Sequence, residues 1–131
     1  MAQLIEDVSH VTAQELRGLL ADPDSRTLVV DVREPEEYVA AHIPGVPLIP
    51  MGDIVDLIDR FDKEREFVLV CRSGRRSLEV AKFFAANGIG RVHNFLGGML
   101  DWQEQGYEVE DGPGLSGEAV MPETLTRGNN R

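Results

Sequence analysis

The 131-residue chain has a single cysteine, Cys71, so it cannot form an internal disulfide. An unpaired thiol is most easily maintained in a reducing compartment. No apolar run approaches the roughly 20 residues that a membrane-spanning helix needs. The N-terminal segment also has neither a basic start nor a long apolar stretch. These absences predict a cytoplasmic protein that does not associate with membranes.

Positive charge is scarce as well, because 13 lysines and arginines face 23 acidic residues and give a formal net charge of −10. Binding to nucleic acid would need an extended basic face, so we expect no nucleic-acid partner. The three histidines, at positions 10, 42 and 93, have no second ligand at metal-site spacing. We therefore expect no zinc site.

The remaining composition is that of a folded domain, with 42% hydrophobic and 27% charged residues. A chain of this length suffices for one domain. The pattern changes after Glu110, where glycines and a proline interrupt it. We therefore expect a domain over residues 1–110 and a tail over residues 111–131. The sequence leaves open whether this tail is mobile or docks on the domain through Val120, Met121 and Leu125.

Short apolar segments alternate with segments of helical periodicity along the domain. The apolar segments predict strands at residues 8–11, 28–30, 67–70 and 91–95. Capping signals and helical spacing predict helices that start after Thr12 and at Pro35, cover residues 54–61 and 78–87, and carry Trp102. Because parallel strands need crossover connections, this alternation predicts an α/β fold with a mainly parallel central sheet and helices on both faces.

The segment Cys-Arg-Ser-Gly-Arg-Arg-Ser, residues 71–77, lies between a predicted strand and a predicted helix. A loop in this position points backbone N–H groups inward above the positive end of the helix, so it suits an anion. Three arginines with no acid between them also favour the thiolate form of Cys71. Cys71 is therefore a candidate nucleophile. The alternative is a buried thiol packed as a small hydrophobe, but unpaired arginines would be a costly lining for a dry core.

This segment resembles the active-site loop of the rhodanese family, which comprises single-domain sulfurtransferases. Two other stretches resemble the family pattern in the expected order, one at residues 31–50 and one around Gly97, Gly98 and Trp102. The resemblance covers residues 8–110. Ala41 and the Val46-Pro47 pair depart from it, but both lie away from the loop.

The resemblance implies transfer of a sulfane sulfur from a small anionic donor, such as thiosulfate or a persulfide, to a small nucleophile or a protein thiol. The transfer would pass through a Cys71 persulfide and need no cofactor. The rest of the loop would bind the donor: Arg72, Ser73, Gly74, Arg75, Arg76 and Ser77. Four further residues are expected to support the site structurally: Asp31, Arg33 and Glu37 as a bracing ion-pair network, and His42 as a ring held in a turn rather than a general base.

Two alternatives come from other classes of protein. A cysteine phosphatase or arsenate reductase of the same fold would need a loop one residue longer that ends in arginine. Here Ser77 occupies that position and Arg76 comes one residue early. A non-catalytic interaction module is the second alternative. An intact Cys71 in a basic loop argues against it, although a protein that only relays sulfur would carry the same features.

Overall fold

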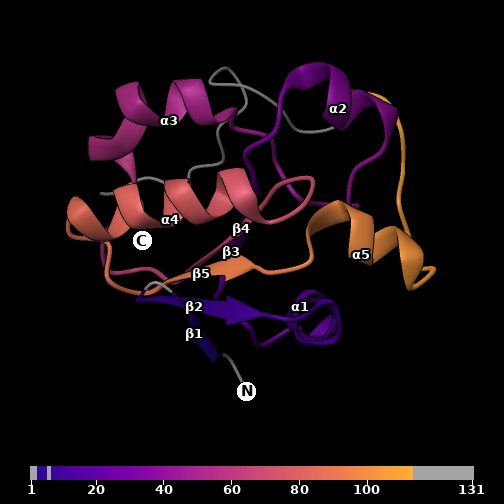
Figure 1. Ribbon diagram of the computed structural model, residues 1–131, viewed down its shortest axis with the longest axis horizontal. Helices are drawn as coiled ribbons and strands as arrows, with labels where there is room; N and C mark the ends of the chain where they lie inside the picture. Colours follow the sequence, from indigo (N-terminus) through magenta and orange to yellow (C-terminus); the bar gives the residue numbers. More distant parts are fainter. Residues whose placement is uncertain (1–2, 6, 114–131) are drawn as a thin grey trace.

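The computed structural model describes residues 3–5 and 7–113, and its centre is a five-stranded sheet in the order β1-β2-β5-β4-β3 (Figure 1). The strands are β1 (Gln3–Ile5), β2 (Val8–Val11), β3 (Leu28–Asp31), β4 (Phe67–Val70) and β5 (Val92–Phe95). Strands β2, β5, β4 and β3 run parallel, and β1 pairs antiparallel with β2. The predicted α/β fold with a mainly parallel sheet is confirmed. Strand β1 was not predicted.

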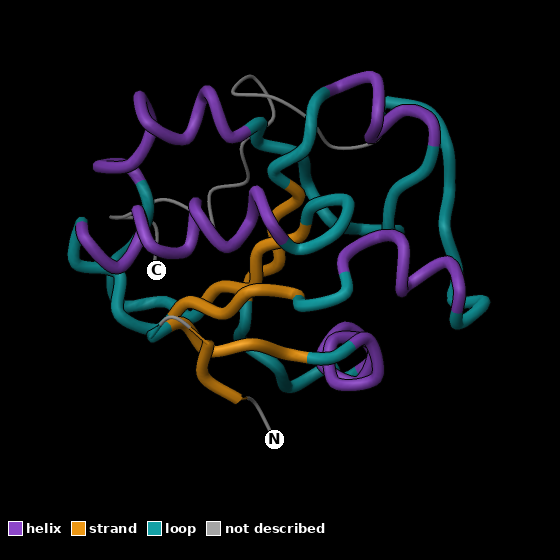
Figure 2. The backbone as a smooth tube through the Cα atoms, viewed as in Figure 1, coloured by secondary structure: helices purple, strands orange, loops and turns teal. Residues whose placement is uncertain are grey.

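Helices cover both faces of this sheet, as predicted (Figure 2). They are α1 (Ala13–Ala21), α2 (Pro35–Ala40), α3 (Met51–Leu57), the 3-10 turn η1 (Ile58–Arg60), α4 (Arg75–Ala86) and α5 (Gly98–Glu104). Helices α3 and α4 pack on one face, and α1 and α5 pack on the other. Within the described residues, no helix is long and apolar enough to cross a membrane.

Strand β4 lies inside the sheet, and all four of its residues are buried. Because successive side chains of a strand point to opposite faces, Phe67 and Leu69 contribute to the core under α3 and α4. Val68 and Val70 contribute to the core under α1 and α5. A strand buried on both faces explains the continuous apolar run in the sequence.

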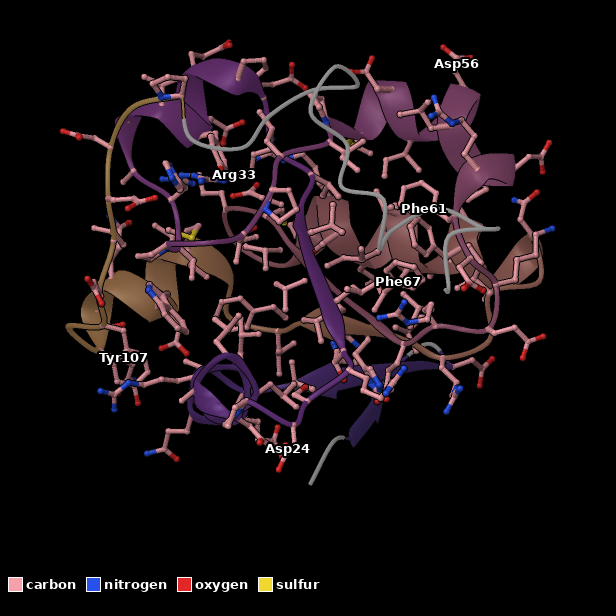
Figure 3. All side chains as sticks on the ribbon, turned by 180° about the vertical axis from the view of Figure 1, so that it is seen from behind. Asp24, Arg33, Asp56, Phe61, Phe67 and Tyr107 are labelled. Carbon is pink, nitrogen blue, oxygen red and sulfur yellow. The ribbon has the colours of Figure 1, made fainter. Side chains whose placement is uncertain are left out.

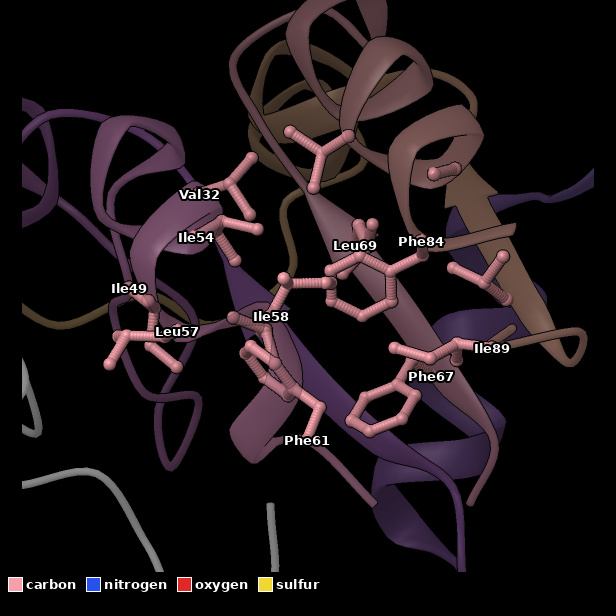
Figure 4. Close-up of a cluster of buried hydrophobic side chains, with 14 of the residues drawn as sticks. Val32, Ile49, Ile54, Leu57, Ile58, Phe61, Phe67, Leu69, Phe84 and Ile89 are labelled. Carbon is pink, nitrogen blue, oxygen red and sulfur yellow. The ribbon is translucent and has the colours of Figure 1, made fainter. Parts of the chain in front are cut away.

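Three phenylalanine rings fill the core between α3, α4 and the sheet (Figure 4). The ring centroids of Phe67 and Phe84 are 5.4 Å apart, and Phe61 lies 5.1 Å from Phe84 and 5.7 Å from Phe67. The edge-to-face geometry of two of these pairs is favourable for aromatic rings. This cluster anchors α4, which starts at the candidate site.

Two helices, α3 and α4, differ from the prediction in their boundaries, and α3 starts at Met51, three residues before the expected residue 54. The helix expected over residues 54–61 ends as α3 at Leu57 and continues only as the turn η1, so Phe61 lies beyond it in an extended conformation. Tightening of the last turn is common at helix ends, and it lets the Phe61 ring enter the aromatic cluster. Helix α4 starts at Arg75, three residues earlier than expected, because Gly74 adopts a left-handed conformation that ends the loop there.

The start of α1 follows the predicted capping box. The Thr12 hydroxyl accepts a hydrogen bond from the Glu15 N–H at 3.1 Å, and the Glu15 carboxylate accepts one from the Thr12 N–H at 2.8 Å. Pro35 occupies the first turn of α2, also as predicted.

The segment after α5 runs back along α2 (Figure 1). The Glu110 N–H donates to the His42 carbonyl at 2.9 Å, and the Gly112 N–H donates to the Val39 carbonyl at 2.9 Å. The predicted boundary after residue 110 stays a prediction. The suggested docking residues Val120, Met121 and Leu125 lie outside the described residues.

Candidate active site

Cys71 follows directly after β4, at the carboxyl end of the parallel strands, and is only 1% exposed. Ligands bind at such ends in open α/β sheets because the strand-to-helix loops meet there. Neighbouring β3 ends at Asp31, which pairs in register with Val70. The fold therefore brings the 31–42 connection next to the cysteine loop.

Three hydrogen-bonding groups surround the sulfur atom of Cys71. The Gly74 N–H lies 3.1 Å from Sγ, the Ser77 N–H lies 3.4 Å from it, and the Ser77 Oγ lies 3.2 Å from it. Ser77 belongs to the first turn of α4, so the helix presents its N-terminal N–H groups toward the sulfur. All three groups can therefore donate a hydrogen bond to the sulfur.

Gly74 is required by the loop geometry. Its φ angle is +94°, in the left-handed region that favours glycine, and a Cβ atom at this position would lie 2.3 Å from the Leu96 carbonyl oxygen. A Cβ atom cannot lie so close to a backbone oxygen, so any side chain here would displace the loop or the backbone at Leu96.

The start of α5 holds the carbonyl groups of the loop on one side. The Met99 N–H donates to the Cys71 carbonyl at 2.9 Å, and the Leu100 N–H donates to the Arg72 carbonyl at 3.0 Å. In a trans peptide, the N–H points opposite to the preceding carbonyl, so the following N–H groups face away from α5. Four N–H groups have no acceptor among the residues that the structure describes: those of Arg72, Ser73, Arg75 and Arg76. They leave a set of donors available to an anion.

The three arginines of the loop differ in their surroundings. Arg72 and Arg75 are exposed. Arg76 makes two parallel hydrogen bonds to the Glu37 carboxylate, at 2.7 and 2.8 Å, and so links α4 to α2. The hydrogen bonds from Arg76 lower the pKa of Glu37 to about 2, and the same bonds raise the pKa of Arg76. Arg76 was predicted to bind the donor and Glu37 to brace the site, and the structure joins the two.

Asp31 and Arg33 form a second, buried ion pair. The Arg33 guanidinium donates to both carboxylate oxygens of Asp31 at 2.9 to 3.1 Å, and to the Ala41 carbonyl at 2.7 Å. Figure 3 shows Arg33 beneath α2, within the body of the domain. Burial raises the pKa of Asp31, and the bonds from Arg33 oppose that change. The pair joins the end of β3 to the end of α2 and thereby shapes the connection beside the cysteine loop.

His42 is fully buried, and its ring stacks on Tyr38 with centroids 3.8 Å apart. Its Nδ1 lies 2.9 Å from the Tyr38 carbonyl, and its Nε2 lies 3.0 Å from the Glu110 carboxylate. The ring thus links α2 to the segment after α5. In this position both ring nitrogens have structural partners.

Two buried polar residues near the cysteine were not predicted, Asn94 on β5 and His10 on β2. The Asn94 amide contacts the Ser77 hydroxyl, the Gly74 carbonyl at 3.0 Å and the His10 Nδ1 at 3.2 Å. A sequence signal existed, because both residues interrupt short strands that are otherwise largely apolar. Neither interruption indicates by itself what the side chain contacts.

Within the described residues, no three His, Cys, Asp or Glu side chains are grouped so that they could hold a metal ion.

The site is a buried cysteine at a strand end, in a loop that directs backbone N–H groups to its sulfur and has further N–H groups without an acceptor among the described residues. The family model described as Rhodanese-like domain matches residues 12–105. The chain belongs to this family.

Curated relatives and solved structures agree with that assignment. YtwF of Bacillus subtilis is 40% identical over 97 residues, which are 74% of this chain and 92% of YtwF. A sulfurtransferase of Allochromatium vinosum is 33% identical over 102 residues, covering 78% of this chain and 94% of the relative. The chain spans only 44% of another relative, YrkF of Bacillus subtilis, at 41% identity. The crystal structure of a rhodanese-like domain protein from Staphylococcus aureus has a TM-score of 0.68 and 36% identity, covering 78% of this chain and 98% of that one.

Proposed function

We propose that this protein is a sulfurtransferase that moves a sulfane sulfur from a small anionic donor to a thiophilic acceptor through a persulfide on Cys71. The observation that carries the proposal is the position of Sγ, with two backbone N–H groups and a hydroxyl within 3.1 to 3.4 Å. Relatives named as sulfurtransferases, among them the Allochromatium vinosum protein and a thiosulfate sulfurtransferase GlpE of Pseudomonas paraeruginosa, support the class of reaction.

With thiosulfate as donor, the Cys71 thiolate attacks the outer sulfur atom. A new S–S bond forms to Sγ, the S–S bond of thiosulfate breaks, and its electron pair leaves with sulfite. The negative charge of the cysteine is then carried by the outer sulfur of the persulfide. A nucleophile such as cyanide or a thiolate attacks that sulfur and releases the Cys71 thiolate. No proton, electron or cofactor has to be supplied from outside in this cycle.

The donor N–H groups of the loop stabilise the anionic outer sulfur, because they have no protein acceptor in the described structure. Arg72 and Arg75 are exposed and attract the anionic donor in a chain that is otherwise strongly acidic. Arg76 adds positive potential at the sulfur but is held by Glu37. In this proposal Arg72 and Arg75 hold the oxygens of the donor, and Arg76 orients the start of α4.

The same features disfavour a phosphatase of this fold. Ser77 places its hydroxyl on Sγ at the position where that class would need arginine, and the guanidinium of Arg76 is turned to Glu37. A protein that only relays sulfur to a partner would form the same Cys71 persulfide. The two functions therefore differ in the acceptor that removes the sulfur. We also propose a cytoplasmic location, because Cys71 has to remain reduced to act.

The direct test is intact-mass spectrometry of protein that has been treated with thiosulfate and then desalted. We expect one added sulfur atom, absent in Cys71→Ser, that cyanide removes as thiocyanate in a one-to-one ratio. Because the chain has no second cysteine, the persulfide cannot be resolved internally and should accumulate. If the mass stayed unchanged while thiocyanate still formed, transfer would not pass through Cys71 and the proposal would be wrong.

A further inference from the structure

A buried chain of polar side chains runs from the sulfur of Cys71 through Ser77 and Asn94 to His10. All four residues are at most 2% exposed. Only Cys71 and Ser77 enter the proposed reaction directly. Buried polar groups are costly unless each hydrogen bond is satisfied, so the direction of every bond in this chain has consequences for the sulfur.

The orientation of the Asn94 amide follows from its neighbours. The Gly74 carbonyl lies 3.0 Å from Nδ2, and a carbonyl oxygen can only accept, so this atom is the NH2 group. His10 Nδ1, at 3.2 Å from the same nitrogen, accepts as well. The other amide atom, Oδ1, therefore faces Ser77 and can only accept.

The Ser77 hydroxyl has one proton and two candidate acceptors, Asn94 Oδ1 and Cys71 Sγ. When the hydroxyl donates to Asn94, its lone pairs face Sγ, and only a protonated thiol can complete that contact. When Cys71 is a thiolate, the hydroxyl turns to the sulfur, because bonds to charged groups are stronger. Asn94 Oδ1 then loses the hydrogen bond from Ser77, its one donor among the described residues. A buried acceptor without a donor is unfavourable.

We infer that Asn94 is a positioning residue that competes with Cys71 for the hydrogen bond that the Ser77 hydroxyl donates. The inference rests on the proposed function in its second part: competition disfavours the resting thiolate but not the persulfide. In the persulfide, Sγ is bonded to a second sulfur and is a weak acceptor, while the charge lies on the outer atom. The Ser77 hydroxyl can then donate to Asn94 again, because Sγ no longer carries a charge that needs this hydrogen bond. Asn94 thus favours the sulfur-loaded cysteine over the empty thiolate.

The first test measures the empty site and needs no sulfur transfer. We expect Cys71 of Asn94→Ala to react with iodoacetamide at mildly acidic pH about tenfold faster than in the wild type, since one hydrogen bond of competition is removed. A substitution that only loosened the loop would also expose the buried sulfur and raise the rate, and the double-mutant cycle below separates that effect from competition for the hydroxyl. Asn87→Ala is the matched control at the far end of α4, where the side-chain amide donates to the Phe83 carbonyl at 2.8 Å, and it should leave the rate unchanged.

A double-mutant cycle locates the effect. In a Ser77→Ala background, the Asn94 substitution should no longer accelerate alkylation, because no hydroxyl proton remains to be shared. Acceleration that persists in that background would overturn the inference, as would unchanged or slower alkylation in folded Asn94→Ala. If a thermal melt shows that Asn94→Ala is unfolded at the assay temperature, Asn94→Leu replaces it in the same cycle, because leucine restores most of the side-chain volume.

The second test concerns loading. Mixtures of thiosulfate and sulfite set the persulfide fraction, which intact-mass spectrometry measures. At a pH where the empty cysteine of both proteins is a thiolate, Asn94→Ala should need about a tenfold higher thiosulfate-to-sulfite ratio for half-loading than the wild type. An unchanged ratio would refute the loading part of the inference. If even the wild type takes up no sulfur, the proposed function and the loading part fail together, and the alkylation cycle still decides the competition for the proton.

Discussion

Replacing Glu37 by glutamine should destabilise the protein by breaking the link between α2 and α4. The pKa of Glu37 falls from an ordinary 4.5 to about 2 because Arg76 donates two hydrogen bonds to its carboxylate. That difference corresponds to about 3 kcal/mol as an upper bound. The Glu37 side chain is 26% exposed and the Arg76 side chain is 33% exposed, so solvent screens their interaction. We therefore expect a loss of about 1 to 2 kcal/mol in the free energy of unfolding at neutral pH.

The pH dependence has a defined sign. A carboxylate whose pKa is lower in the folded state stabilises the fold above its unfolded pKa, here 4.5, and loses that contribution as the pH falls toward about 2. Urea unfolding of wild type and Glu37→Gln at several pH values should show a difference that is largest above pH 4.5 and shrinks below it. High salt should reduce the difference as well.

Glu36→Gln provides the matched control, because Glu36 is an exposed neighbour in the same first turn of α2. It should change the unfolding free energy by less than about 0.5 kcal/mol. The reasoning would be refuted by a Glu37→Gln protein as stable as the control at neutral pH, or by a difference that grows as the solution becomes more acidic.

Three further outcomes are expected. Gly74→Ala should slow alkylation of Cys71 and lower stability by more than about 1 kcal/mol, because its Cβ would lie 2.3 Å from the Leu96 carbonyl oxygen. Iodoacetamide kinetics measure the first effect and thermal melts the second. A variant that reacts as fast as the wild type would contradict the loop geometry. Arg72→Ala and Arg75→Ala should each raise the KM for thiosulfate severalfold with little change in kcat, and added salt should raise the KM of the wild type in the same way. Steady-state kinetics identical to those of the wild type would exclude both arginines from donor binding. Phe84→Ala should cost about 3 to 5 kcal/mol in urea unfolding, since its ring is fully buried between two others, and a cost below about 1 kcal/mol would show that the cluster can collapse around the gap.

Local signals in the sequence predicted most elements of the fold. The four parallel strands, the capping box at Thr12 and the proline at the start of α2 all appear where the pattern placed them. Such features depend on residues within one turn or one strand, so they are visible without tertiary contacts. Strand β1 escaped prediction because three residues, Gln3–Ile5, are too short to show a period.

The cysteine loop was also located from the sequence, but its internal boundary was not. Whether Arg75 to Ser77 belong to the loop or to α4 depends on the left-handed conformation of Gly74, at a position where the Leu96 carbonyl leaves no room for a Cβ. The order of residues indicated three arginines in one basic loop, with no acid between them. It could not show that one of them is bound to a carboxylate.

What only the tertiary structure decided are the pairings across the chain. Arg76 meets Glu37 from 39 residues away, and Asn94 meets Ser77 from 17 residues away, because parallel strands bring their carboxyl ends and following helices to one edge of the sheet. The sequence by itself determined the kinds of residue available and the order of strands and helices along the chain. The order of strands across the sheet brought those residues into hydrogen-bonding distance, and hydrogen bonds act only at such short range.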